Sequence, residues 1–585
     1  MNLETQKRTI QGFRLSPQQK RVWTLQQQEQ QSSQAQCAVL LAGELDSRAL
    51  TTALTEVVKR HEILRTRVRC LPGMSVPLQV ITEPGPLTLE ERDLSAWTAT
   101  EQIRQIEELW EETRHQSGNL EEQFWFRFWL VRLSPKQHVL MVSIPTLCAD
   151  LVGLRNLVAE ISRCYDPILR EQRLADEPVQ YADVSEIQNE LLEDQETEAG
   201  KEYWRKQDLS GLHGLRLPGA HEAREGRGVA SHSIGHSIAV AQGAEIEALA
   251  GKCDADKMVV LLASWHVLLW RLTGQSHLIV GTCFDGRNYE GLESALGLFS
   301  RYLPISAQLE TNIRFHELVA HLARVTAESR EYQEYFTWAD DEGAAANEPY
   351  FPFCFEYLEQ PESYVARGVS FTIYKEYACT DRFAVKLSCV RTGESLKAEF
   401  HYDSNVYAEA DIERLAAEYQ TLLQSVVAEP EAAIGTLEIV SATEREQLLV
   451  EWNDTAAAYS MDQCVHELFE QKAAETPDAV ALVYEDEHLS YGELNRRANQ
   501  VAHYLRGLGV GAEVAVGLCV ERSLEMLVGV LGILKAGAAY LPLEPSYPGA
   551  RLSFMLADAA APVLLTQPHL RERLGEVAAE VVCVD

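Results

Sequence analysis

Residues 139–165, VLMVSIPTLCADLVGLRNLVAEISRCY, decide the fold of this chain. Residues 139–144 are apolar except for Ser143, a pattern typical of a buried strand. Pro145 lacks the N–H group that a central ladder requires, so it suits the end of that strand. Beyond Asp150 the apolar residues recur at helical spacing: Leu151, Leu154, Leu157, Val158 and Ile161. The stretch therefore predicts a strand, a short turn and a helix, which hold the side chains of the turn on rigid supports.

The turn contains four candidate site residues, namely Pro145, Thr146, Cys148 and Asp150. The Thr146 hydroxyl does not titrate near neutral pH, so it cannot act as a general base. Cys148 has no histidine near it in the sequence and nothing that lowers a thiol pKa. We therefore interpret Cys148 as a packed core residue and not as a nucleophile.

The part of the chain before this stretch mixes strands with helices. Residues 14–25 predict a turn that enters a helix, with Ser16 as the cap and Pro17 at the first helical position. Further strands are predicted at residues 38–41, 78–91 and 124–133, and further helices at residues 50–58 and 101–114. Together with the opening stretch, these elements predict one α+β lobe over residues 1–176.

A second α+β lobe is predicted over residues 177–429. It begins with an acidic, helical crossover at residues 181–207, and residues 257–272 form a strongly apolar helix. His266 lies in that helix, and a lone histidine on an apolar face indicates a satisfied core residue. The other predicted elements are strands at residues 277–282, 351–358, 383–389 and 396–402, and a closing helix at residues 411–427.

The composition changes again at residues 430–436, and residues 430–460 are predicted to be a linker. Helices then alternate with strands over residues 461–585, which indicates a parallel α/β sheet. The sequence stops directly after a strand-like run at residues 581–584. We therefore expect this last domain to be cut before its end.

The composition limits the class of protein. The 585 residues are 46% hydrophobic and 24% charged, as in ordinary globular chains of several domains. A formal net charge of −35 argues against nucleic acid or an anionic membrane as a partner. The twelve cysteines lack zinc-site spacing, which favours reduced thiols and no metal site. No secretion signal or membrane-spanning run is present, so we expect a cytoplasmic protein.

Several stretches resemble the core motifs of condensation domains of nonribosomal peptide synthetases, in their order and spacing. They are RLSPQQKRVWTL, RHEILRT, YADVSEIQ, VGTCFDGRN and LGLFSRYLP, and the resemblance covers residues 13–427. Behind them, LSYGELN and LKAGAAYLPLEPSYP are similar to the first two motifs of an adenylation domain. WNDTAAAY followed by CVHELFEQ is similar to the usual beginning of that domain.

The resemblance implies a fold and a set of partners. Two lobes like those of chloramphenicol acetyltransferase would form a V around a tunnel, followed by a partial α/β adenylation domain. Acyl and aminoacyl groups would arrive as phosphopantetheine thioesters on acyl-carrier or peptidyl-carrier domains. The phosphate loop of the adenylation domain would lie beyond residue 585, so ATP belongs to the complete domain. We expect this fragment to bind no cofactor itself and to activate no amino acid.

The family motif HHxxxDG falls on residues 145–151, and this sequence departs from it. Both histidines and the glycine are absent, and only Asp150 is kept. Thr146 stands where the resemblance places the histidine that assists the attacking amine. Pro145 also breaks the DxxxxD motif of the related heterocyclisation domains. The resemblance therefore implies Thr146 and Asp150 as the residues of an atypical catalytic turn.

The second lobe carries the other residues that the resemblance implies. Arg287 matches the family's motif arginine and is expected to form a charge-assisted link to Asp150 across the lobes. Ser300 and Arg301 replace the usual Val-Asn pair, which changes the polarity expected of the tunnel. Thr380 and Asp381 lie where heterocyclisation domains use a threonine and an aspartate, but the flanking motif is poor, so we interpret both as surface-loop residues.

Three functions stay open at this point. The first is an acyltransferase that joins a carrier-bound acyl group to an amine, a hydroxyl or another nucleophile. The second is a catalytically silent domain that docks carrier domains or supports the adenylation domain. The third is a heterocyclisation domain, against which the missing DxxxxD motif argues. No carrier precedes residue 1, so a donor, if one is used, is expected to arrive in trans.

Overall fold

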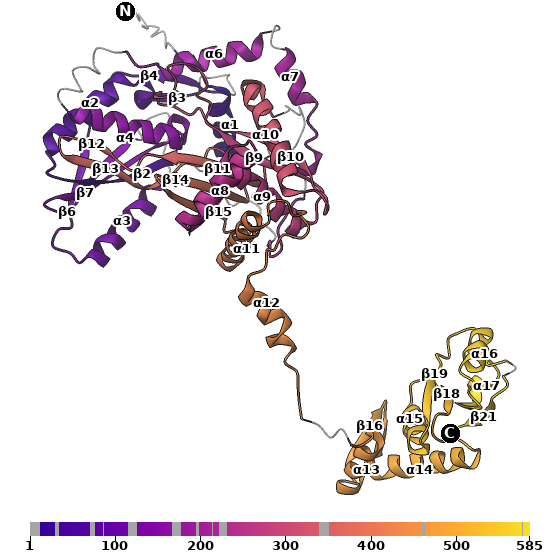
Figure 1. Cartoon of the computed structure of the whole chain (residues 1–585). Coiled ribbons are helices and arrows are strands. Elements are labelled where there is room, and N and C mark those ends of the chain that lie inside the picture. The colour runs from indigo at the N-terminus through magenta and orange to yellow at the C-terminus, as the bar shows by residue number, and fades with distance from the viewer. Residues whose placement is uncertain are drawn as a thin grey trace, which may run out of the picture. The chain divides into compact units, whose positions relative to one another are not determined.

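The structure is a computed structural model that describes residues 12–29, 34–70, 76–85, 87–114, 126–166, 177–194, 198–212, 214–221, 231–338, 350–458, 462–575 and 577–584. The chain divides into two compact units, Met1–Glu451 and Trp452–Asp585. The first unit contains two six-stranded sheets and a small three-stranded one (Figure 1). No helix in the described part of the chain is both long and apolar enough to cross a membrane.

The first six-stranded sheet contains the opening stretch. Its order is β12 (Tyr364–Ala366), β13 (Val369–Tyr377), β2 (Gln34–Ala42), β7 (Gln137–Pro145), β6 (Arg127–Ser134) and β5 (Leu89–Asp93). Only β5 and β6 pair in parallel. Helices α2 (Ser47–Arg60) and α4 (Leu151–Tyr165) pack on one face, and α3 (Ala99–Arg114) packs on the other.

Strand β7 is apolar throughout because both faces of this sheet are covered. Leu140, Val142 and Ile144 enter the core beneath α2 and α4, whereas Val139 and Met141 enter the core beneath α3. A strand buried on both faces has a nearly continuous apolar run in place of an alternating one. The predicted strand, turn and helix are therefore confirmed, with a 3-10 turn η2 (Thr146–Cys148) between β7 and α4.

The second six-stranded sheet has helices packed on one of its faces. Its order is β10 (Arg301–Gln308), β9 (His277–Phe284), β11 (Phe353–Gln360), β14 (Val385–Thr392), β15 (Ser395–Asp403) and β8 (Ser231–Ile238). Strand β11 runs parallel to both its neighbours, and the other pairs are antiparallel. The covering helices are α8 (Val240–Lys252), α9 (Lys257–Thr273), α10 (Phe315–Glu331) and α11 (Glu409–Ala428).

His266 in α9 is a core residue, as predicted. Its Nδ1 lies 2.9 Å from Leu262 O and its Nε2 lies 3.2 Å from Ile305 O. Burial lowers the pKa of this imidazole to about 4, so the ring is neutral at neutral pH. A neutral ring has one N–H, which donates to one of these two carbonyl oxygens.

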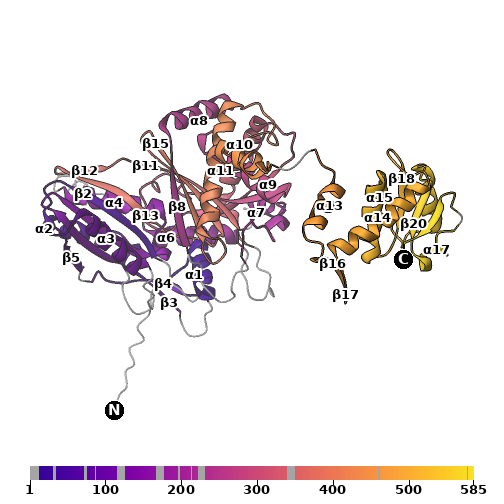
Figure 2. The same cartoon turned by 90° about the horizontal axis from the view of Figure 1, so that it is seen from below.

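The two large sheets do not divide the chain at a single point. Strands β12 and β13 follow β11 in the sequence, yet β13 pairs antiparallel with β2 of the first sheet. Figures 1 and 2 show β12 and β13 beside β2, although more than three hundred residues separate them. Strands β8 and β13 were not predicted from the sequence, because their alternating, partly polar patterns are weaker than those of the buried strands. The boundaries at residues 176, 429 and 460 remain predictions, and residues 176 and 460 lie outside the described residues.

Smaller elements complete the first unit. The three-stranded sheet has the order β1 (Phe13–Arg14), β4 (Leu78–Ile81) and β3 (Thr66–Arg69). The helices described there are α1 (Pro17–Glu29), α6 (Tyr181–Glu193), α7 (Glu198–Arg205) and α12 (Ala442–Leu449), with 3-10 turns η1 (Glu62–Arg65), η4 (Ser210–Leu212) and η5 (Gln333–Tyr335). The 3-10 turn η6 (Glu451–Asn453) contains the point at which the chain passes from the first unit to the second. Ser16 accepts from the backbone of Gln19 at 3.1 Å, as a cap of α1 should.

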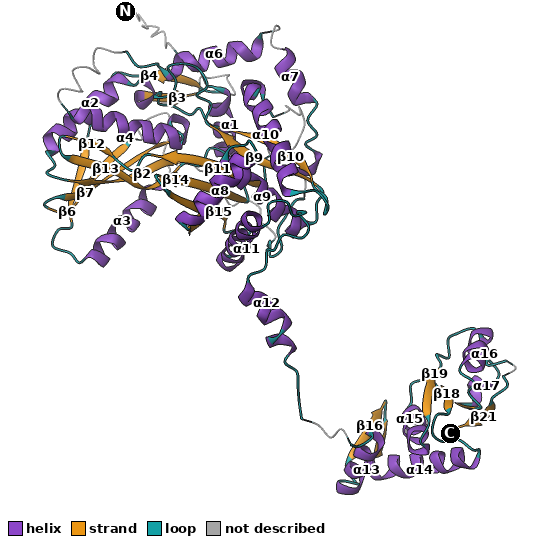
Figure 3. Ribbon diagram, viewed as in Figure 1, coloured by secondary structure: helices purple, strands orange, loops and turns teal. Residues whose placement is uncertain are grey.

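The second unit has the predicted α/β pattern (Figure 3). Its parallel sheet has the order β19 (Ala539–Pro542), β18 (Ala515–Cys519), β20 (Val563–Thr566) and β21 (Glu580–Cys583). The predicted strand at β16 (Val480–Tyr484) instead forms an antiparallel hairpin with β17 (Glu487–Ser490). The helices are α13 (Val465–Glu475), α14 (Tyr491–Gly507), α15 (Leu524–Ala536), α16 (Gly549–Asp558) and α17 (Pro568–Arg571).

Candidate functional site

Asp150 ends the turn after β7 and caps helix α4. Its Oδ1 accepts a hydrogen bond of 2.6 Å from the backbone N–H of Gly153, which is one of the helix's otherwise unpaired donors. The same carboxylate faces the loop of residues 285–300, which leads into strand β10. Its Oδ2 accepts from the backbone N–H groups of Phe299 and Ser300, each at 2.8 Å.

The predicted contact between Asp150 and Arg287 is present. Arg287 Nη2 donates to Asp150 Oδ1 at 3.0 Å, and Nη1 donates to Oδ2 at 3.1 Å. Both side chains are only 1% exposed. With the three backbone donors, the Asp150 carboxylate accepts five hydrogen bonds. A carboxylate offers about four lone-pair sites, so Asp150 is saturated and cannot also take a proton from a substrate in this geometry.

Arg287 joins the loop of residues 285–300 to the motif turn. Its Nη1 also donates to Asp285 Oδ1 at 2.5 Å, and its guanidinium lies 4.4 Å from the centre of the Phe299 ring. Burial acts to lower the pKa of Arg287, but the carboxylates of Asp150 and Asp285 outweigh it, so the pKa is raised. Burial also raises the pKa of Asp285. Asp150 and Arg287 thus form a buried, bidentate ion pair, and bidentate pairs between arginine and a carboxylate are among the strong hydrogen-bonded contacts in proteins.

Gly297 is required where this loop meets the motif turn. Its φ of +150° is unfavourable for other residues, and a Cβ built there would lie 2.0 Å from Cδ2 of Tyr181. Its carbonyl oxygen accepts from the backbone N–H of Asp150 at 3.4 Å. Tyr181 in turn donates to Leu298 O at 2.5 Å and lies 2.7 Å from Ser16 Oγ. Four of the motif stretches named above, which contain Ser16, Tyr181, Arg287 and Gly297, therefore meet around one buried carboxylate.

The other residues of the turn are enclosed in the core. Thr146 is 0% exposed, and its Oγ1 has no hydrogen-bond partner among the described residues. Pro145 pairs with Gln34 at the end of β7. Burial raises the pKa of the Cys148 thiol to about 12, so it stays protonated and is not a nucleophile. The interpretation of Cys148 as a packed residue is confirmed.

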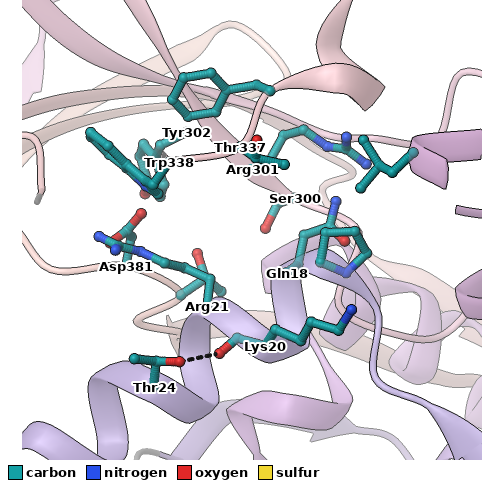
Figure 4. Close-up of a pocket in the computed structure, with 14 residues that line it drawn as sticks. Gln18, Lys20, Arg21, Thr24, Ser300, Arg301, Tyr302, Thr337, Trp338 and Asp381 are labelled. Carbon is teal, nitrogen blue, oxygen red and sulfur yellow. Dashed lines mark hydrogen bonds and ion pairs between the residues drawn. The ribbon is translucent and has the colours of Figure 1, made fainter. Parts of the chain in front are cut away.

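A pocket of about 340 Å³ lies beside this turn, between α1 and the start of β10 (Figure 4). Helix α1 contributes a face of polar side chains, and the opposite wall comes from β10 and two loops. The lining residues are Pro17, Gln18, Lys20, Arg21, Thr24, Leu192, Ser300, Arg301, Tyr302, Phe336, Thr337, Trp338, Thr380 and Asp381. The predicted tunnel residues Ser300 and Arg301 therefore line a real pocket, whereas Thr146, Cys148, Asp150 and Arg287 do not line it.

An ion pair spans this pocket. Arg21 Nη2 of α1 lies 2.7 Å from Asp381 Oδ1, and the Arg21 guanidinium lies 5.1 Å from the Trp338 ring. Our interpretation of Asp381 as a surface-loop residue was wrong, because Asp381 is buried and lines the pocket, whereas Thr380 is a partly exposed loop residue that also lines it. The buried Asp381 carboxylate is stabilised because two groups donate hydrogen bonds to its Oδ1. They are Arg21 Nη2 and the backbone N–H of Arg382, each at 2.7 Å.

Arg301 is held in a similar way. Its Nη2 donates to Glu334 Oε2 at 2.7 Å and its Nη1 donates to Gln333 O at 2.8 Å. Sequence reasoning missed Arg21 and Trp338. The signal for Arg21 was its spacing, since residues 17, 20, 21 and 24 fall on one face of a helix. Trp338 had no local signal. No group of three or more His, Cys, Asp or Glu side chains in the described parts could hold a metal ion.

Two family models match the chain. Residues 10–449 match the Condensation domain, and residues 469–585 match the AMP-binding enzyme family. A linear gramicidin synthase of Brevibacillus parabrevis is 32% identical over 587 residues, which cover 98% of this chain and 11% of that protein. Chondramide synthase cmdD of Chondromyces crocatus is 33% identical over 591 residues, covering 98% of this chain and 15% of that protein. The chain thus spans a small part of these curated relatives.

Solved structures show the same fold. A four-domain nonribosomal peptide synthetase bound to AMP and glycine aligns with a TM-score of 0.80 at 18% identity, over 98% of this chain and 44% of that one. The X-domain from teicoplanin biosynthesis aligns with a TM-score of 0.61 at 20% identity, over 74% of this chain and 98% of that one. The chain therefore belongs to the condensation domain family of the nonribosomal peptide synthetases, with an AMP-binding region behind the condensation domain.

Proposed function

We propose that the first unit acts on carrier-bound acyl and aminoacyl thioesters and forms an amide or a related bond between them. The observation that supports this proposal is the pocket between helix α1 and strand β10 of the second sheet, beside the buried pair of Asp150 and Arg287. Carrier domains bearing phosphopantetheine would deliver both groups, and the AMP-binding region would use ATP when complete. The protein would work in the cytoplasm.

The residues of the motif turn would act by positioning. Asp150 is saturated by its five donors, so it holds the turn against Arg287 and does not transfer protons. Thr146 keeps a hydroxyl without a partner among the described residues, and this hydroxyl would bind a substrate group after a movement of the turn that exposes it. An unpartnered buried hydroxyl is costly, and such costs are typical of functional sites.

Chemistry without a base at this turn is feasible because a thioester is already activated. Holding two reactants in the correct geometry contributes about 7–11 kcal/mol in well-oriented systems. A missing general base costs about 10²–10⁴-fold in rate. We therefore expect a slow enzyme whose rate comes mainly from proximity.

A second candidate function is a silent domain that docks carrier domains without chemistry. The burial of Thr146 favours it, because a fully enclosed hydroxyl cannot reach a substrate unless the turn moves. Under this alternative the unit would still bind a loaded carrier and would form no product.

Intact-protein mass spectrometry separates the two candidates. The full chain is mixed with a carrier protein loaded with a hexanoyl thioester and a second carrier loaded with a glycyl thioester. Transfer of the hexanoyl mass to the glycyl carrier supports the acyltransferase, and Thr146→Val should slow that transfer by up to about 10-fold, the worth of one hydrogen bond. Carrier binding without transfer supports the docking function. Equal transfer rates for wild type, Thr146→Val and Asp150→Ala would exclude the motif turn from the reaction.

A further inference from the structure

Both walls of the pocket contact the motif turn. On one wall, Ser300 lines the pocket, and its backbone N–H donates to Asp150 Oδ2 at 2.8 Å. On the other wall, helix α1 reaches the turn through Gln19, whose Nε2 donates to Leu147 O at 2.9 Å. Thr146 nevertheless is 0% exposed and does not line the pocket. The turn is therefore enclosed between the two walls, and a group in the pocket does not reach Thr146.

A contact between Arg301 and Gln18 joins these two walls. Arg301 begins β10, and Gln18 lies in α1 (Figure 4). The side-chain oxygen of Gln18 accepts from Arg301 Nε at 3.0 Å and from Nη2 at 2.5 Å. The side-chain nitrogen of Gln18 donates to Gln188 Oε1 of α6 at 3.2 Å, so both groups of the amide have a partner. The contact therefore holds α1 against β10 across the pocket.

The 3-10 turn η5 holds the same guanidinium from another side. Arg301 Nη1 donates to Gln333 O at 2.8 Å, and Nη2 donates to Glu334 Oε2 at 2.7 Å. The side chains of Arg301 and Glu334 are buried, with exposures of 8% and 7%. All three nitrogens of the guanidinium therefore have partners, and these partners come from α1 and η5.

Glu334 offers Arg301 a second position. The Oε1 of Glu334 is buried and has no hydrogen-bond partner within the described ranges of the chain. Leaving a buried acceptor unpaired costs free energy. If Arg301 turns away from Gln18, its Nε can donate to Glu334 Oε1 while Nη2 keeps Oε2, which is the bidentate arrangement that arginine and carboxylates favour. The new charge-assisted bond offsets the loss of the bonds to the neutral Gln18 amide.

We propose that the contact between Gln18 and Arg301 is a gate at the inner end of the pocket. While the gate is closed, α1 stays against β10, and the motif turn stays enclosed because Gln19 ties it to α1. When Arg301 turns toward Glu334, α1 and the turn are free to move, and Thr146 becomes exposed to the pocket. This inference rests on the proposed function, for which Arg301 and Gln18 control the access of a substrate group to the turn.

Thiol labelling measures the open form. The full chain with Thr146→Cys is treated with methyl methanethiosulfonate, and peptide mapping follows the modification of position 146 over time. The labelling rate tracks the population of the open form when the gate opens and closes faster than the reagent reacts. Adding Arg301→Ala or Gln18→Ala should speed the labelling about 10-fold or more, the equivalent of one hydrogen bond to a charged group. Glu334→Gln should not speed it, because this change weakens the second position of Arg301.

Arg324→Ala is the matched control, because Arg324 is an exposed arginine that does not line the pocket, and its loss should leave the labelling rate unchanged. Cys37 is 0% exposed in the core of the same sheet, so its labelling reports unfolding. Equal labelling rates at position 146 with and without Arg301→Ala would overturn the gate. So would labelling of Cys37 in parallel with position 146, or faster labelling in Glu334→Gln.

Hydrogen exchange in the native background is the second measurement, and it decides the matter if Thr146→Cys fails to fold. Peptides that cover residues 146–150 should exchange about 10-fold faster in Arg301→Ala than in the wild type, and equal exchange would overturn the gate. Labelling and exchange need no thioester substrate. A failure of the transfer assay above would not change either result, so the two proposals fail separately.

Discussion

Replacing Asp150 by alanine should destabilise the first unit strongly. The substitution leaves the Arg287 guanidinium, which is almost fully buried, without its bidentate partner. It also leaves the backbone N–H groups of Gly153, Phe299 and Ser300 without their acceptor. Because each of these groups is enclosed in the protein, water cannot replace the lost carboxylate without rearrangement.

The magnitude follows from the contacts. Breaking a buried ion pair costs about 3–5 kcal/mol, and losing a helix N-cap accounts for about 1 kcal/mol. Asp285 offsets part of this cost, since it stays within 2.5 Å of Arg287 Nη1. We therefore expect the free energy of unfolding to fall by about 3–5 kcal/mol. The exposed pair of Arg324 and Glu328 provides a control, and Glu328→Ala should cost less than about 1 kcal/mol.

Urea unfolding followed by tryptophan fluorescence measures this loss. All ten tryptophans except Trp452 lie in the first unit, so the signal reports that unit. In a double-mutant cycle, Asp150→Ala combined with Arg287→Ala should cost less than the sum of the two single variants. A loss for Asp150→Ala below about 1.5 kcal/mol, the net worth of an ordinary hydrogen bond, would refute the reasoning. Additive costs would show that the two side chains act independently.

Three further predictions concern buried groups. Thr146→Val should stabilise the first unit by about 1–3 kcal/mol in urea unfolding, because it removes an unpartnered buried hydroxyl; a loss of stability would mean that the hydroxyl has a partner. Burial lowers the pKa of His266 to about 4 from an ordinary 6.5, so the unfolded chain binds more protons and stability falls as the pH drops through this window. Between about pH 7 and pH 5 the wild type should lose about 2 kcal/mol more than His266→Gln, and equal losses would contradict the assignment. Because burial raises the pKa of Cys148 to about 12, iodoacetamide at mildly alkaline pH should label the exposed Cys464 and Cys583 in peptide mapping and spare Cys148 until the chain unfolds.

The sequence was informative wherever the physics is local. The run at residues 139–144, the cap at Ser16 and the apolar helix around His266 are short-range patterns, and the structure has each of them. The family motifs also predicted the contact between Asp150 and Arg287, although 137 positions separate the two residues. That contact came from resemblance, because no spacing rule brings two such distant residues together.

Long-range pairing could not be predicted in the same way. Strand β13 lies between β11 and β14 of the second sheet in the sequence, yet it pairs with β2 of the first sheet. Its alternating pattern indicates a strand but does not identify the strand with which it pairs. Asp381 was taken for a surface residue because a carboxylate in a polar loop is usually solvated, whereas the fold buries it against Arg21.

The sequence by itself therefore determined most of the buried strands and helices, the order of the domains and the loss of both histidines from the motif turn. Only the tertiary structure decided which groups meet: it surrounded the Asp150 carboxylate with five donors, buried Asp381 against Arg21, and enclosed Thr146. The reason is physical. Periodicity and capping depend on neighbours within a few residues, whereas burial and hydrogen-bond satisfaction depend on which distant strands the fold brings side by side.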